Sequence, residues 1–80
     1  MTTIFDLTER EIEIARELSH GLSSDEISTK LFISVFTVNT HRRNAMMKVH
    51  AKNTAHLIRK CFEFGVFKSR EELILTGVKY

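Results

Sequence analysis

The sequence predicts an all-α fold, a bundle of four helices followed by a short fifth helix at the C-terminal end. Three observations predict this fold: the 80 residues contain no proline, helix-capping signatures recur along the chain, and apolar residues return at helical spacing. Eighty residues are enough for one small domain. A domain of this size buries only about 60% of its unfolded surface, so we expect modest stability and a benefit from a partner chain.

The first helix is predicted to start at Thr8. Thr8 and Glu11 have the spacing of a capping box, in which each residue satisfies a backbone amide of the other. Apolar residues then recur on one side, and charged residues that include Glu17 are expected on the side that faces solvent. Gly21 suits the left-handed position that follows a helix, so the helix should end just before it.

The second and third helices are predicted to form a helix-turn-helix. Ser23 and Glu26 make another capping box, and the second helix should run to about Leu31. After a short apolar turn, Ser34 is a good N-cap for a third helix over residues 34–48. Two helices joined by a short turn, the second of them polar and basic, are typical of the helix-turn-helix arrangement.

The fourth helix is predicted over residues 53–64, with Asn53 as its N-cap and Gly65 at its end. This helix has more apolar side chains than one buried stripe needs, so the surplus can pack on the first helix or pair with a second copy of the chain. A further capping box predicts the fifth helix within an extension over residues 68–80, beyond a domain of residues 1–67.

Charge is distributed unevenly along the chain, although the net charge is only +2. No Asp or Glu occurs from Ile27 to Phe62, and this basic block holds seven cations: Lys30, Arg42, Arg43, Lys48, Lys52, Arg59 and Lys60. A basic block between acidic flanks is expected of a surface that binds phosphates. The alternative is a solvated face on which acids are sparse by chance.

Several other classes of function find no support in the sequence. The four histidines fall in different local settings, without acids or thiols at metal-ligand spacing, so neither a metal nor a cofactor is predicted. No glycine-rich phosphate loop or glycine-framed nucleophile is present, which argues against an enzyme. Cys61 is the single cysteine and is expected in the core or at an interface, in keeping with a reducing cytoplasm. No apolar run approaches the roughly 20 residues of a membrane helix, and no signal peptide opens the chain.

The chain also resembles a known family. The motifs that carry the resemblance are Leu7-Thr8-x-Arg10-Glu11, Gly21-Leu22-Ser23, Glu26-Ile27, Leu31-x-Ile33-Ser34, Thr37-Val38-x-x-His41-x-x-Asn44 and Lys48-Val49. In order and spacing they are similar to the LuxR/GerE-type helix-turn-helix domain over about residues 5 to 65. The resemblance implies a four-helix DNA-binding domain of the kind found as the output module of bacterial response regulators, in which the fourth helix commonly pairs two copies.

The resemblance also implies roles for individual residues. Base contacts fall on Asn39, Thr40 and Arg43, residue types that can bind adenine, the thymine methyl group and guanine. Contacts to the DNA backbone fall on Ser34, Thr37, Arg42 and Lys48, with further candidates at Ser23, Lys30 and Asn53. For a dimer interface on the fourth helix, the sequence offers Leu57, Ile58, Cys61 and Phe62. Thr54 stands where the family often has an arginine, which removes one usual backbone contact.

The preferred interpretation is a cytoplasmic, sequence-specific DNA-binding transcription regulator that acts as a homodimer, with RNA polymerase as a further partner. One alternative is a helical protein-interaction domain that docks on RNA polymerase or another regulator. The acid-free block argues against it, because a docking domain has no need to exclude acids there. Another alternative is a module like sigma region four, which shares the first three helices. The fourth helix and the His41-x-x-Asn44 motif favour the LuxR type.

Overall fold

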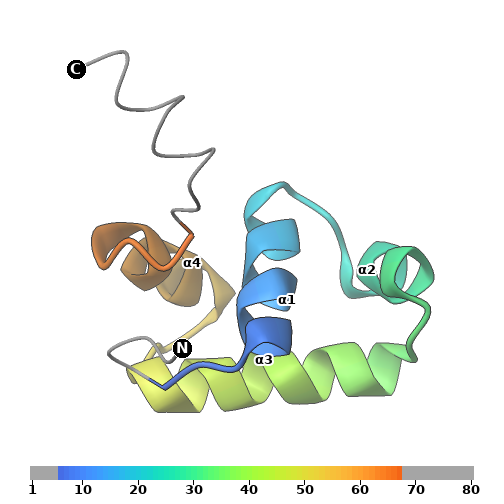
Figure 1. Cartoon of the computed structure of the whole chain (residues 1–80), viewed down its shortest axis with the longest axis horizontal. Coiled ribbons are helices and arrows are strands. Elements are labelled where there is room, and N and C mark those ends of the chain that lie inside the picture. Colours follow the sequence, from blue (N-terminus) through green and yellow to red (C-terminus); the bar gives the residue numbers. More distant parts are fainter. Residues whose placement is uncertain (1–5, 68–80) are drawn as a thin grey trace.

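The computed structural model describes residues 6–67, and the regular structure in that range is four helices without a strand. They are α1 (Glu9–Ser19), α2 (Ser24–Leu31), α3 (Val35–Val49) and α4 (Thr54–Glu63). In Figure 1, α3 lies along one edge of the molecule, α1 stands at its centre, and α2 and α4 lie to either side of α1. The predicted all-α bundle is confirmed, whereas the predicted fifth helix at 68–80 lies outside the described residues.

Both capping boxes predicted at the starts of the first two helices are present. The Thr8 hydroxyl oxygen accepts from the Glu11 amide at 3.1 Å, and the Glu11 carboxylate accepts from the Thr8 amide at 2.9 Å. Ser23 and Glu26 make the same reciprocal pair at 3.2 and 2.8 Å. Two otherwise unpaired amides are satisfied at each helix start, which fixes where α1 and α2 begin.

Four of the six remaining helix boundaries also follow the sequence signals. Ser34 and Asn53 cap α3 and α4 through side-chain oxygens that accept first-turn amides at 3.0 and 2.8 Å. Gly21 and Gly65 have φ angles of 90° and 69°, a left-handed conformation that glycine adopts without steric cost. These two glycines therefore stop α1 and α4 close to the predicted ends.

Within residues 6–67 the core consists of two apolar clusters, and α1 and α3 contribute to both. Ile14, Ile27 and Val38 form the first cluster, which holds α2 against α1 and the N-terminal half of α3, and each is fully buried. The second cluster holds α4 against the C-terminal half of α3 and consists of Leu7, Ala15, Ala45, Val49, Leu57, Cys61 and Phe67. Burying an Ile or Leu side chain stabilises a fold by about 1.5–3 kcal/mol. The two clusters therefore fix α2 and α4 independently on the α1–α3 pair.

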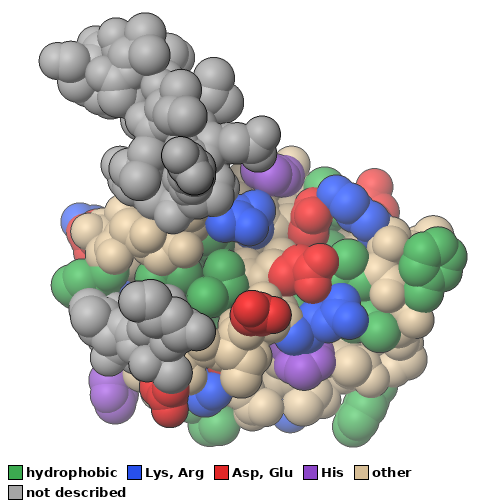
Figure 2. All heavy atoms as spheres, viewed as in Figure 1, with side chains coloured by type: hydrophobic (Ala, Val, Ile, Leu, Met, Phe, Trp, Pro, Cys, Tyr) green, Lys and Arg blue, Asp and Glu red, His purple; other side chains and the backbone are tan. Residues whose placement is uncertain are grey.

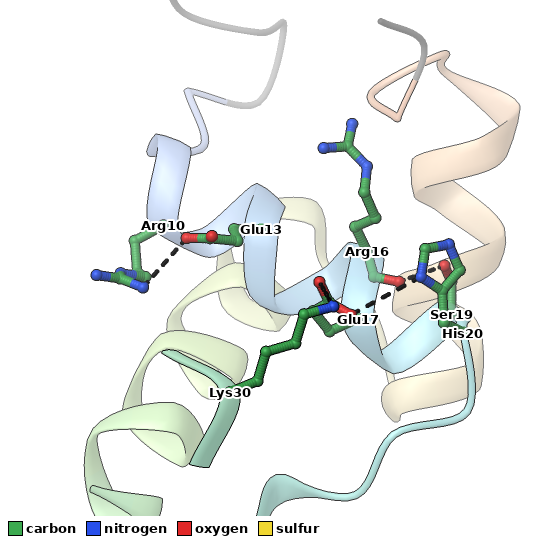
Figure 3. A network of polar contacts seen from close by, with 7 residues as sticks. All are labelled: Arg10, Glu13, Arg16, Glu17, Ser19, His20 and Lys30. Atoms are coloured by element: carbon green, nitrogen blue, oxygen red, sulfur yellow. Dashed lines mark hydrogen bonds and ion pairs between the residues drawn. The ribbon is translucent and has the colours of Figure 1, made fainter. Parts of the chain in front are cut away.

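The prediction that Glu17 faces solvent is wrong. Glu17 is only 8% exposed, and its Oε2 atom lies 2.8 Å from the Nζ atom of Lys30. Figure 3 shows Lys30 reaching from α2 to this carboxylate on α1, with the His20 imidazole on the other side, 3.8 Å from Oε1. The position is covered because α2 packs against α1, a tertiary contact that the helical spacing of α1 alone does not reveal.

Candidate nucleic-acid interface

One long side of α3 faces away from the bundle. Val38 and Ala45 are fully buried on the inner side. Residues at positions i, i+4, i+7 and i+11 share one side of a helix. Four residues of α3 have this spacing and lie on the side opposite Val38 and Ala45. This outer ridge consists of Phe36, Thr40, Arg43 and Met47. Figure 1 shows that the other helices all lie on the same side of α3, so that the outer ridge has no helix against it.

The structure brings the three predicted base-contacting residues together on this outward side. Arg43 is exposed, and no polar partner within residues 6–67 occupies its guanidinium group. The Thr40 hydroxyl donates to the backbone carbonyl of Phe36 at 2.9 Å. Asn39 lies beside the ridge, where the Ser24 hydroxyl of α2 donates to its Oδ1 atom at 2.8 Å. A carbonyl oxygen has a second lone pair, so Asn39 keeps both a donor and an acceptor for a ligand.

Two ridge residues were missed by the sequence interpretation. The side chain of Phe36 is 77% exposed and that of Met47 is 63% exposed. A fully buried Phe or Met would stabilise the fold, so exposure of both on one face is a feature to be explained. The signal was present in the sequence, because Phe36 stands four, seven and eleven residues before Thr40, Arg43 and Met47.

Three of the predicted backbone-contacting residues are helix N-caps. Ser23, Ser34 and Asn53 cap α2, α3 and α4, so each lies beside first-turn amides that carry partial positive charge. The Ser34 hydroxyl donates to the Thr37 hydroxyl oxygen at 2.9 Å, which leaves the Thr37 hydroxyl proton for another acceptor. The first turns of α3 and α4 contain no acid and so favour anions such as phosphate, whereas Asp25 and Glu26 already stand in the first turn of α2.

Arg42 connects α3 to the start of α4. Its Nη1 atom donates to the hydroxyl oxygen of Thr54 at 3.1 Å. Thr54 is the first residue of α4, so the Arg42 guanidinium lies beside the positive end of that helix. A cation and a helix N-terminus at the same place reinforce each other for anion binding.

Lys48 has an ion-pair partner inside the protein. Its Nζ atom lies 2.9 Å from Oε1 of Glu11, a residue that is only 3% exposed, and also donates to the Asp6 carbonyl at 3.3 Å. Burial raises the pKa of the Glu11 carboxyl, but the hydrogen bonds from Lys48 and Thr8 and the lysine charge lower its pKa below the usual value overall. A phosphate contact by Lys48 or Lys30 would have to share the ammonium group with the Glu11 or Glu17 carboxylate, which already offsets its charge.

Two of the four predicted interface residues on α4 are internal. Leu57 is fully buried and Cys61 is 1% exposed, because this side of α4 packs on α1 and α3. Neither side chain can reach a second copy in this conformation, which corrects their assignment to a dimer surface. Burial also raises the pKa of the Cys61 thiol to about 11, in keeping with a core residue. Ile58 is half-buried and Phe62 is 59% exposed.

Folding divides the basic block into neutralised and free cations. Ion pairs join three of the seven cations to acids outside the block: Lys30 to Glu17, Lys48 to Glu11 and Arg59 to Glu63. The other four, Arg42, Arg43, Lys52 and Lys60, form no ion pair with residues 6–67. Acidic side chains gather over α1 on the face shown in Figure 2, whereas α3 itself contains none. Of these four cations, Arg42 and Arg43 lie on α3 and Lys52 just precedes α4, whereas Lys60 lies in the last turn of α4.

The described residues form neither a metal site nor a membrane span. In that part of the chain, no three His, Cys, Asp or Glu side chains are grouped so that they could hold a metal ion. The four helices are also too short or too polar for any of them to span a bilayer.

The fold and the outward side of α3 define a helix-turn-helix domain of the DNA-binding class. Residues 6–61 match the bacterial regulatory proteins of the luxR family. The chain is 38% identical over 63 residues to the transcriptional regulatory protein LnrK of Bacillus subtilis, and 39% identical over 57 residues to the transcriptional regulatory protein UhpA of Escherichia coli. These matches cover 79% and 71% of the chain and 29% of each relative. The chain belongs to the luxR family of bacterial regulatory proteins.

Proposed function

We propose that this domain binds duplex DNA in a sequence-specific manner, with α3 in the major groove, and that it regulates transcription in the bacterial cytoplasm as a homodimer. The observation that carries the proposal is the outward side of α3, which presents an exposed arginine, an amide and no acid. A major groove about 12 Å wide admits an α-helix, and a helix-turn-helix places its second helix there.

Base reading is assigned to the side chains that α3 presents outward. The Arg43 guanidinium has the planar fork that binds O6 and N7 of guanine. Asn39 keeps a donor and an acceptor, the pair of groups that binds adenine. The Thr40 hydroxyl proton is held by the helix backbone, so this residue contributes chiefly through its methyl group.

Phosphate binding is assigned to positions around the edge of α3. Ser23, Ser34 and Asn53 supply helix N-termini, Thr37 supplies a hydroxyl proton, and Arg42 supplies a full charge. Contacts of this kind fix the position and orientation of the protein on the duplex without reading sequence. The two lysines of the predicted set are left out, because buried carboxylates of α1 hold their ammonium groups.

The dimer surface is assigned to an apolar strip on α4. Ala55, Ile58 and Phe62 stand at helical spacing on the side of α4 that borders the core, and both Ala55 and Phe62 are exposed. Two copies joined there would read half-sites about one helical turn of DNA apart. The Phe62→Glu variant should sediment as a monomer and bind a two-half-site DNA more weakly. If the unaltered protein stays monomeric on that DNA, the proposal of a dimer through α4 is wrong.

The experiment that tests the function is selection of bound DNA from a random pool at physiological salt. The enriched sequences should share a common half-site, and pairs of half-sites should be about one helical turn apart. The affinity for the selected DNA should fall as salt rises, by a slope of about 0.9 in log K for each phosphate neutralised. A pool without a shared sequence, bound with an affinity that salt does not change, would contradict the proposal.

A further inference from the structure

The outer ridge of α3 is mainly apolar, although the face around it is polar. Phe36 and Met47 are 77% and 63% exposed at its two ends, and Arg43 is its only charged member. The Thr40 hydroxyl donates to the Phe36 carbonyl at 2.9 Å, so its proton is not available to a base. The ridge thus places the Arg43 guanidinium between the apolar side chains of Phe36 and Met47. Such a surface complements a major groove in which a guanine, with its O6 and N7 acceptors, lies near the methyl group of a thymine.

Phe36 is well placed to meet a base edge. It is the second residue of α3, and the N-terminal residues of a recognition helix are those that contact bases. Its ring lies on the same side of the helix as Arg43, opposite the buried Val38. Because the ring remains 77% exposed, it contributes little to the core and is free to pack against a ligand.

The groups that bases present in the major groove indicate which base the Phe36 ring would contact. Thymine is the only base of unmodified DNA that presents a methyl group in the major groove, and phenylalanine is among the side chains that contact it. Phe36 and Arg43 are seven residues apart, which is about 10 Å along the helix at 1.5 Å per residue. At about 3.4 Å per base pair, this distance corresponds to about three base pairs.

We propose that Phe36 is a specificity-determining residue that packs against the C5-methyl group of a thymine, about three base pairs from a guanine bound by Arg43. This inference rests on the proposed function, since it names the base that one residue of the same surface reads. It makes the thymine methyl group, rather than the thymine oxygen O4, the feature recognised at that position.

The experiment replaces each thymine of the selected half-site with deoxyuridine, one position at a time, and measures the affinity. Deoxyuridine lacks the methyl group but keeps every hydrogen-bonding group of thymine. At the position that Phe36 contacts, the unaltered protein should lose affinity by about fourfold, the value of one buried methyl group. The Phe36→Ala variant should bind the thymine and deoxyuridine forms of that position equally, while Phe36→Leu should keep part of the discrimination.

A matched control is available in Phe32, a second exposed phenylalanine that precedes α3 and is 93% exposed. The Phe32→Ala variant should discriminate between thymine and deoxyuridine as the unaltered protein does. Circular dichroism would verify that the variants keep their helices, which is expected because both rings are exposed.

Two results would overturn the inference while the proposed function stands. In one, the protein selects a sequence but tolerates deoxyuridine at every position. In the other, Phe36→Ala keeps the full discrimination, which would assign the methyl contact to another residue such as Thr40. A protein that selects no sequence would overturn both the proposed function and this inference.

Discussion

Replacement of Glu11 by glutamine should destabilise the domain through a single lost charge. The Glu11 carboxylate is 3% exposed and accepts from the Thr8 amide and from the Lys48 ammonium group, each at 2.9 Å. Glutamine at this position can still complete the capping box. The substitution therefore keeps the start of α1 and removes only the charge that holds α3 to it.

The size of the effect follows from these contacts. A hydrogen bond to a charged group contributes about 1.5–3 kcal/mol, against about 1 kcal/mol for a neutral one, so the variant should lose about 0.5–2 kcal/mol of unfolding free energy. For a domain of this length, each kcal/mol lowers Tm by about 4–8 °C. The comparison should be made at pH 7 by chemical and thermal unfolding.

The stability lost in Glu11→Gln should also depend on pH. The folded-state pKa of Glu11 lies below its ordinary value of 4.5, so its contribution to stability is complete above that pH and is lost as the pH falls through the folded-state pKa. The stability difference between the unaltered protein and Glu11→Gln should therefore be constant near neutrality and shrink in acid.

A matched control comes from Glu13, whose ion pair with Arg10 is exposed on α1 (Figure 3). Both side chains of that pair are 40% or more exposed, so Glu13→Gln should change stability by less than about 0.5 kcal/mol. The reasoning is refuted if Glu11→Gln is as stable as the unaltered protein at pH 7, or if the two substitutions have equal effects.

Three further outcomes are expected. The Phe32→Gly variant should be about 1 kcal/mol more stable in denaturant unfolding, because Phe32 has a φ of 58° and its exposed ring does not offset the left-handed strain; equal or lower stability would show that the ring packs. Arg42→Ala should lower the salt slope of log K for DNA by about 0.9, whereas Lys48→Gln should destabilise the fold and leave that slope unchanged; a reduced slope for Lys48→Gln would restore its predicted phosphate contact. Cys61 should react slowly with iodoacetamide at pH 8 until the protein unfolds, because the thiol is buried and has a pKa of about 11; rapid labelling of the folded protein would contradict its place in the core.

The sequence was most informative where structure depends on neighbours along the chain. A capping box needs only residues three apart, so the starts of α1 and α2 could be predicted at Thr8 and Ser23. The ends at Gly21 and Gly65 likewise depend on a local left-handed conformation. The family resemblance, carried by motifs in this same region, was confirmed over residues 6–61.

The sequence was less informative where one helix covers another. Helical spacing alone places Glu17 in solvent, because nothing within α1 shows that Lys30 approaches it from α2. An apolar stripe on a helix has the same sequence pattern whether it packs on the core of its own chain or on a second copy. The pattern alone therefore does not show that Leu57 and Cys61 are core residues, as the structure does. The left-handed conformation of Phe32 was also unforeseen, since this backbone region normally selects glycine or asparagine.

The candidate site was predictable in its location but not in its composition. Asn39, Thr40 and Arg43 lie on the outward side of α3, where the sequence placed them. The apolar ends of the ridge, Phe36 and Met47, became apparent only when the direction of the buried side was known. Whether these residues read bases stays a prediction.

The central claim is that α3 reads sequence through its outward side, and competition between cognate and scrambled DNA tests it most directly. The Arg43→Ala variant should lose about 1–3 kcal/mol of preference for the cognate site. Arg59→Ala removes the same charge from α4, where Arg59 pairs with Glu63, and should keep the cognate-to-scrambled ratio of the unaltered protein. An Arg43→Ala variant with an unchanged ratio, or an equal loss of preference in both variants, would contradict the account.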